Sequence, residues 1–177
     1  MTDAVATDGP PPPGSRGVGV SDRFQRVRVP ALPTILFADA SADYREMARD
    51  ALLEGRNATD MRTVGDGQEL LSYLERGGAT EGVVMPRPSL IVVDANLPGT
   101  PAGVDPVRAI KGDPSTRRIP VIVLGQSDDP QAVLAAYDAG ANTYIVKPVT
   151  FLALVRLMKV FTAYWLETAE LPPRQAA

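Results

Sequence analysis

Asp39, Asp94 and Lys147 each follow directly after a short apolar run, and the ends of such runs are where a parallel sheet gathers its chemistry. Two carboxylates and one ammonium in one crevice suit phosphoryl transfer to a carboxylate. A carboxylate attacks a phosphoryl group poorly because both are negative, so cations must neutralise the charge that develops. Mg²⁺ held by carboxylates supplies one cation, and a lysine supplies a point charge. Two structural alternatives stay open: Asp94 caps a loop, or the three residues form a simple salt-bridged cluster.

The segments that must position these residues alternate between strands and helices. Short, unbroken apolar runs are typical of strands that are covered on both faces. Strands are expected at 34–38, 58–64, 90–93, 121–124 and 143–146. Their alternation with five helices predicts an α/β fold: one five-stranded parallel sheet, doubly wound with right-handed crossovers, of the flavodoxin-like (βα)5 type.

Capping residues predict where the helices begin and end. Ser41 or Asp43 suits the start of the first helix and Gly55 its end, while Asp66 and Glu69 form a capping-box pattern for the second. The second helix is expected to end at 77–78, and the remaining helices are expected at 104–111, from the Asp129-Pro130 start to Gly140, and at 150–167.

Composition excludes several classes of chemistry. The 177 residues contain neither Cys nor His, so disulfides, thiolate nucleophiles and imidazole bases are absent from this chain. The formal charge of -3 and the lack of a dense Lys/Arg cluster argue against nucleic-acid binding. No apolar run reaches the roughly 18 residues of a membrane span and no signal peptide is visible, so we expect a cytoplasmic protein without membrane contact.

The domain organisation follows from the same patterns. Residues 1–32 are rich in Pro and Gly and have no periodic apolar face, so a disordered N-terminal tail is expected there. One folded domain should span residues 33–168, and residues 169–177 should form a C-terminal tail.

Four stretches, in this order and spacing, resemble the receiver domain of two-component response regulators across about residues 33–168. They are Ile35–Asp39, Val92–Gly99, Ile119–Leu124 and Ala139–Pro148. The details at 127–129 and 164–166 look most like the stand-alone, CheY-like regulators that partner phytochrome-type histidine kinases. The resemblance implies a stand-alone response regulator, not an enzyme, that accepts phosphate from a histidine kinase and signals through protein contacts.

The resemblance also assigns roles to individual residues. Asp94 matches the phosphoacceptor, and Lys147 matches the lysine that contacts the phosphoryl group. Asp39 matches the first residue of the acidic pair, and with Asp94 and the main-chain carbonyl of Asn96 it would bind Mg²⁺. Tyr144 matches the aromatic switch residue. The bond from the lysine to the proline after it is expected to be cis, as in the family.

The sequence departs from the family pattern at two positions of the site, Ala40 and Gly125. Ala40 stands where the family has its second, metal-binding acid, which predicts weak or absent Mg²⁺ binding. Gly125 stands where the family has Thr or Ser, which removes the hydroxyl that links the phosphoryl group to Tyr144. The loop at 100–103 is also one residue longer. Two versions stay open: slow phosphorylation of Asp94, or a phosphorylation-independent pseudo-receiver that acts as an interaction and dimerisation module.

Two helices carry predictions about their faces. Apolar residues of the last helix fill an arc of roughly 220°, against about 100° for a single core-facing stripe. The surplus predicts a second buried contact, and we expect a homodimer through this helix; coverage by the chain's own tail is the alternative. In the helix that follows Asp129, the apolar residues Val133, Leu134 and Tyr137 are expected to face the core.

These residues fit two other classes of protein less well. A phosphatase of the haloacid-dehalogenase type also uses a strand-end Asp, but it needs an acid where Asn96 stands. A flavodoxin-like cofactor binder needs a phosphate-binding loop after the first strand, where this chain has Asp39 and Asp43 instead.

Overall fold

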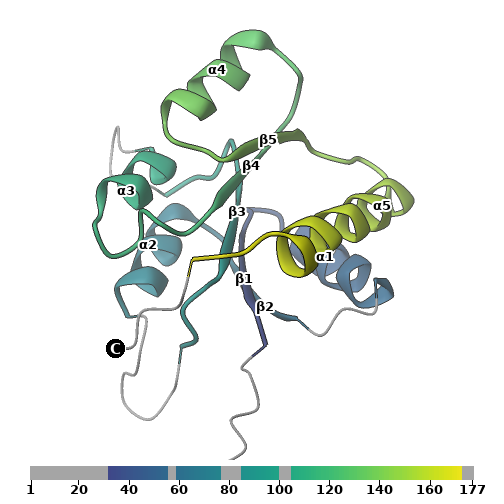
Figure 1. Cartoon of the computed structure of the whole chain (residues 1–177). Coiled ribbons are helices and arrows are strands. Elements are labelled where there is room, and N and C mark those ends of the chain that lie inside the picture. Colours follow the sequence, from purple (N-terminus) through teal and green to yellow (C-terminus); the bar gives the residue numbers. More distant parts are fainter. Residues whose placement is uncertain (1–31, 56–58, 77–84, 100–104, 173–177) are drawn as a thin grey trace, which may run out of the picture. The chain divides into compact units, whose positions relative to one another are not determined.

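The strands form a single parallel sheet in the order β2-β1-β3-β4-β5 (Figure 1). The structure is a computed structural model that describes residues 32–55, 59–76, 85–99 and 105–172, all within one unit that begins at Leu32. The strands are β1 (Thr34–Ala38), β2 (Asp60–Val64), β3 (Leu90–Asp94), β4 (Val121–Gly125) and β5 (Thr143–Val146). The predicted five-stranded parallel sheet is confirmed, and β3 lies at its centre between β1 and β4.

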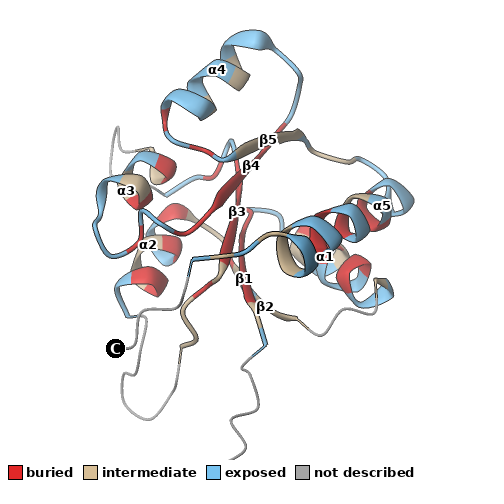
Figure 2. Ribbon diagram, in the orientation of Figure 1, coloured by how far each residue is buried: buried red, intermediate tan, exposed pale blue. Residues whose placement is uncertain are grey.

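Helices cover both faces of this sheet, as the predicted doubly wound fold requires. They are α1 (Ala42–Glu54), α2 (Gly67–Glu75), α3 (Pro106–Gly112), α4 (Pro130–Asp138) and α5 (Phe151–Thr162), followed by a π-helical turn, η1 (Ala163–Thr168). One apolar cluster joins the sheet to α1 and α5, and the other joins it to α2 and α3. Figure 2 shows β1, β3 and β4 in red, as buried, and red segments on α1, α2, α3 and α5.

The predicted caps explain where three of the helices begin. The side chains of Ser41, Asp66 and Asp129 each accept a hydrogen bond from a backbone N–H in the first turn of α1, α2 and α4. In α2, Glu69 Oε2 accepts from the backbone N–H of Gly65 at 2.7 Å. In the predicted capping box, Glu69 therefore accepts from the residue before the N-cap, not from the backbone N–H of the N-cap residue Asp66.

The prediction for the inner face of α4 was wrong for two of its three residues. Leu134 is 63% exposed and Tyr137 is 48% exposed, and no residue of α4 is fully buried. Instead, the small side chain of Ala136 packs against the core. The larger apolar residues of α4 therefore point to solvent, as its mostly blue ribbon in Figure 2 indicates.

The last helix has more apolar surface than its contact with the core covers. Leu154, Val155, Met158 and Phe161 are buried against the sheet and α1, whereas Leu152 is 61% and Val160 is 70% exposed. The predicted surplus of apolar surface is present. The helical course continues to Thr168, close to the predicted end, but its final turn is a π-helix.

Several predictions fall on residues outside the described ranges. They concern the tail up to residue 31, the helix end at 77–78, the longer loop at 100–103 and the last residues of the C-terminal tail. Among the described residues, no helix is both long and apolar enough to cross a bilayer.

Candidate functional site

The three charged residues singled out in the sequence meet at the carboxyl-terminal edge of the sheet. Asp39 follows β1, Asp94 ends β3, and Lys147 follows β5. The ammonium Nζ of Lys147 lies 2.5 Å from Oδ2 of Asp39 and 2.5 Å from Oδ2 of Asp94. Their side chains are 1% exposed for Asp39, 8% for Asp94 and 12% for Lys147. The predicted cluster is therefore present and almost closed to solvent.

Hydrogen bonds with the backbone orient the side chains of Asp39, Asp94 and Lys147 toward one another. Oδ1 of Asp39 accepts from the backbone N–H of Ser41 at 2.9 Å, and Oδ1 of Asp94 accepts from that of Asn96 at 2.8 Å. Each carboxylate keeps its Oδ2 for the lysine. The backbone N–H of Lys147 donates to the carbonyl of Gly125 at 2.7 Å. This bond extends the β4–β5 pairing by one residue and holds the lysine over Asp94.

Burial and charge oppose each other in this cluster. Burial raises the pKa of Asp39, although Lys147 and the N–H of Ser41 act in the opposite direction. Burial alone would lower the pKa of Lys147, but its contacts with Asp39 and Asp94 raise it overall. The two carboxylates therefore favour the charged form of Lys147, and Asp39 carries its own charge against the cost of burial.

Tyr44 is a site residue that the sequence analysis missed. The ammonium of Lys147 lies 4.1 Å from the centroid of the Tyr44 ring, a cation–π arrangement. The Tyr44 hydroxyl donates to the carbonyl of Pro148 at 3.2 Å. Burial raises the pKa of this phenol, and Asp39 and Asp94 add to the rise. Tyr44 lies in the first turn of α1, five residues after Asp39. This position could have suggested the contact, because the start of α1 lies next to the ends of the strands.

The oxygen donors present suit a hard divalent cation. Mg²⁺ in proteins is bound through one or two carboxylates and keeps several waters or phosphate oxygens. Oδ2 of Asp39 is buried and touches Lys147 without a hydrogen bond aligned to it, so it has coordination capacity left. The described residues contain no group of three or more acidic or imidazole ligands. Asp39, Asp94 and the carbonyl of Asn96 therefore fit Mg²⁺ better than a metal that needs a full protein cage.

Two expectations taken from the family resemblance need correction or refinement. No described peptide bond is cis, so the bond between Lys147 and Pro148 is trans; this isomer is intrinsically favoured by about 0.5–1 kcal/mol at proline, and the Tyr44 contact with Pro148 forms without a cis bond. Ala40 is exposed, and its carbonyl accepts from Arg45, as does that of Asp39. Asp39, not position 40, supplies the acid that reaches the lysine.

The phenol of Tyr144 lies where a side chain at position 125 would be. A Cβ added at Gly125 would overlap the hydroxyl oxygen and the Cζ atom of Tyr144 and would come within 2.6 Å of Cε2. The phenol thus fills the space that a Thr or Ser side chain would need. Its hydroxyl donates to the carbonyl of Ser127 at 2.7 Å, in the loop between β4 and α4.

A cavity of about 470 Å³ opens beside Asp94. Asp94, Asn96 and Tyr144 line it, together with apolar residues of β3, β4, α3 and α4. The cavity brings the carboxylate and the phenol into one space, with room for a group attached to Asp94.

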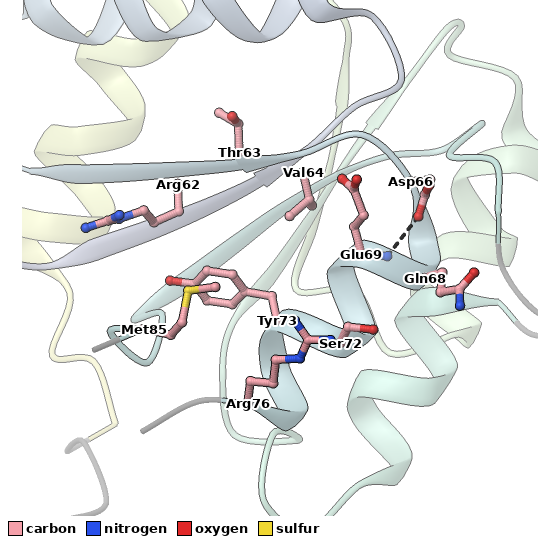
Figure 3. A pocket seen from close by; sticks show the side chains of 10 residues that line it. All are labelled: Arg62, Thr63, Val64, Asp66, Gln68, Glu69, Ser72, Tyr73, Arg76 and Met85. Carbon is pink, nitrogen blue, oxygen red and sulfur yellow. Dashed lines mark hydrogen bonds between the residues drawn. The ribbon is translucent and has the colours of Figure 1, made fainter. Parts of the chain in front are cut away.

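A second hollow, of about 510 Å³, lies between β2 and α2 (Figure 3). It shares no lining residue with the first cavity. Its acids serve local structure: Asp66 caps α2, and Glu69 accepts from Gly65. Arg62 pairs with Asp60 at 2.9 Å. These groups are engaged within β2, at the start of α2 and in the turn between them.

Comparison with known proteins identifies this arrangement. The model of the response regulator receiver domain matches residues 35–159. The chain belongs to this family. It is a response regulator of two-component signalling, in a family whose role is signalling rather than metabolic catalysis.

Individual relatives agree with this assignment. Response regulator Rcp1 of Synechocystis sp. is 32% identical over 138 residues, which cover 78% of this chain and 91% of Rcp1. The crystal structure of the phosphorylated cyanobacterial phytochrome response regulator RcpA superposes with a TM-score of 0.71 at 32% identity, over 81% of this chain and 100% of that one. The Mn²⁺-bound form of Rcp1 superposes with a TM-score of 0.68 at 29% identity, over 80% and 99%.

Proposed function

We propose that Asp94 of this receiver domain accepts a phosphoryl group from a phosphohistidine of a histidine kinase. The contact that carries the proposal is that of Lys147 Nζ with Asp94 Oδ2, at 2.5 Å. In the transfer, a carboxylate oxygen of Asp94 bonds to phosphorus as the phosphorus–nitrogen bond of the donor breaks, and the imidazole takes up a proton. Lys147 neutralises charge on the phosphoryl oxygens during this exchange.

Asp39, Asp94 and the main-chain carbonyl of Asn96 would hold Mg²⁺ in this site. The ion supplies charge neutralisation at the phosphoryl oxygens when it is bound. The chain's own part is to offer Oδ2 of Asp39, which lies 2.5 Å from Nζ of Lys147. Because Lys147 bridges the two carboxylates, it must share Asp39 with an arriving cation, and we infer that the affinity is weak. The Mn²⁺-bound form of the relative Rcp1 supports a divalent cation here.

The partner that this proposal favours is a histidine kinase of the phytochrome type. RcpA is described as a cyanobacterial phytochrome response regulator, and another similar structure is described as a bacteriophytochrome response regulator. RcpA was solved in its phosphorylated form, which favours phosphorylation over the pseudo-receiver alternative. We place the protein in the cytoplasm, with a kinase as donor and without nucleic-acid contact.

We also propose that the protein forms a homodimer through α5. Phe151, Leu152 and Val160 of α5 are exposed, and so are Val149 in the segment before α5, Val146 of β5, and Leu134 and Tyr137 of α4. An apolar surface of this kind costs free energy in water and favours a protein contact. A second copy of the chain offers the same surface, as a twofold interface needs.

Phosphorylation can be tested with acetyl phosphate and increasing Mg²⁺, followed by electrophoresis in gels that retard phosphorylated protein. Wild-type protein should give a retarded band, and Asp94→Asn should give none. Asp50→Asn, which changes an exposed carboxylate on α1, is the matched control and should behave as wild type. Failure of the wild type to shift at any Mg²⁺ concentration would favour the phosphorylation-independent version instead.

A further inference from the structure

The phenol of Tyr144 and the missing side chain of Gly125 occupy one and the same place. The hydroxyl oxygen of Tyr144 overlaps the position that a Cβ of residue 125 would take. A Thr or Ser at 125 would carry its own hydroxyl on that Cβ, in the same region as the phenol's oxygen. The chain has therefore lost one hydroxyl at the end of β4 and has placed another there from β5.

We propose that the Tyr144 hydroxyl replaces the Thr or Ser hydroxyl as the donor to a phosphoryl oxygen on Asp94. This inference rests on the proposed function, because it needs a phosphoryl group at that residue. A phenol O–H is a good donor to a charged oxygen, and such bonds are short and strong when water is excluded.

The register of the sheet puts this hydroxyl on the correct side of Asp94. Leu124 pairs with Asp94, and Gly125 is the next residue along β4. Tyr144 packs against the cluster that faces α2 and α3, whereas Lys147 reaches Asp94 together with Asp39 and Tyr44, from the side of α1. The ammonium and the phenol thus flank Asp94 from different sides, and both Asp94 and Tyr144 line the cavity of about 470 Å³.

The same hydroxyl is also a switch, because it has only one proton to donate. In this structure it donates to the carbonyl of Ser127. Donation to a phosphoryl oxygen removes the bond to Ser127 and so releases the loop that leads into α4. The contact differs between the two states, which is the requirement for phosphorylation to shift a conformational equilibrium. One tyrosine here combines the tasks that the family divides between a hydroxyl residue and an aromatic residue.

Rates of phosphorylation by acetyl phosphate test the contact. Tyr144→Phe keeps the ring but lacks the hydroxyl, and its rate should fall about 10-fold, the effect of losing one hydrogen bond to a charged group. Tyr164→Phe, which removes the hydroxyl of a tyrosine that is 55% exposed, is the matched control and should keep the wild-type rate. An unchanged rate in Tyr144→Phe would overturn the inference while leaving phosphorylation of Asp94 intact.

A pair of variants at position 125 provides a second kinetic test. Both Gly125→Ala and Gly125→Ser force the phenol out of its place, because each adds the overlapping Cβ, but only Ser returns a hydroxyl. We expect a slow Ala variant and a Ser variant close to wild type. Equal rates for the two, whether both fast or both slow, contradict a role for the hydroxyl. No labelling of the wild type at all overturns the proposed function and the inference together.

The switch can be followed at the amide of Asp128, which shares its peptide unit with the Ser127 carbonyl. Addition of Mg²⁺ and beryllofluoride, a phosphoryl analogue, should shift the Asp128 amide resonance of the wild type toward its position in free Tyr144→Phe. The same addition should leave that resonance unmoved in Tyr144→Phe. A wild-type resonance that stays in place while others around Asp94 move would show that the hydroxyl keeps its bond to Ser127, and would refute the switch.

Discussion

The ammonium of Lys147 lies 4.1 Å from the centroid of the Tyr44 ring. The same tyrosine donates its hydroxyl to the carbonyl of the next residue, Pro148. α1 thus fixes both the side chain and the backbone of the segment that follows β5. Residues more than a hundred positions apart in the sequence act as one support for the lysine.

Replacement of Tyr44 should therefore slow phosphorylation. Tyr44→Leu removes the ring under the ammonium, and cation–π contacts of about 0.5–2 kcal/mol predict a fall in rate of roughly 2-fold to 30-fold. Tyr44→Phe keeps the ring and loses only the bond to Pro148, so it should lie close to wild type. Initial rates with acetyl phosphate measure both, and equal rates for Leu and Phe variants would show that the ring does not position Lys147.

Asp39 should limit the stability of the fold. Burial raises its pKa above the ordinary value of 3.8, so the folded state binds the proton more tightly than the unfolded state does. Stability is then lost as the pH rises from 3.8 through the folded pKa. Asp39→Asn removes this cost while Lys147 stays paired with Asp94, and it should be more stable than wild type at pH 7 by on the order of 1 kcal/mol.

Urea unfolding at pH 4 and pH 7 measures this effect of Asp39. The advantage of Asp39→Asn should shrink toward pH 4, where the wild-type carboxyl gains its proton. Asp50→Asn is again the exposed control and should change stability little at either pH. A variant that is less stable than wild type at pH 7 would show that the ion pair outweighs the cost of burial.

Lys111 has a structural role that a surface lysine lacks. Its Nζ donates to the carbonyl of Ile119 at 2.8 Å, to that of Arg117 at 3.3 Å and to Oδ1 of Asn142 at 2.9 Å. Burial lowers its pKa. Lys111→Met would leave these acceptors without their donor and should destabilise the protein by about 2–3 kcal/mol. Thermal unfolding checks this against Lys159→Met, an exposed control that should lose less than about 0.5 kcal/mol.

The proposed dimer depends on exposed apolar residues of α5. Val160→Glu places a charge in that surface and should convert a dimer to monomer in sedimentation velocity at tens of micromolar protein. Leu53→Glu introduces the same charge at a residue of α1 that is 68% exposed, and it should leave the dimer intact. A wild-type monomer under these conditions would contradict the proposal.

The fold was predictable because local signals agreed with one another. The run before Asp94 could be a strand only if both its faces were covered, and the structure covers both with helices. Ser41, Asp66 and Asp129 cap helices for a reason that is visible in the sequence: each is a short side chain that accepts from the first turn. The meeting of Asp39, Asp94 and Lys147 followed from the parallel topology alone.

Predictions that depended on side-chain packing were less successful. The size of Leu134 and Tyr137 suggested burial, but α4 meets the sheet through small alanines, and periodicity does not distinguish a tightly packed face from an exposed apolar one. Tyr44 was not singled out in the sequence, because its contact with Lys147 depends on how α1 packs against the segment after β5. The overlap of Tyr144 with the place left by Gly125 depends on the rotamer of one ring, which no spacing in the sequence determines.

The strand order has a consequence for the newly made chain. Asp39 leaves the ribosome first and Lys147 last, and β3, which carries Asp94, needs β1 on one side and β4 on the other. A partly synthesised chain holds the acceptor but not the cation that makes it usable. Under the proposed function, an unfinished chain that lacks Lys147 would therefore be a poor acceptor of phosphate.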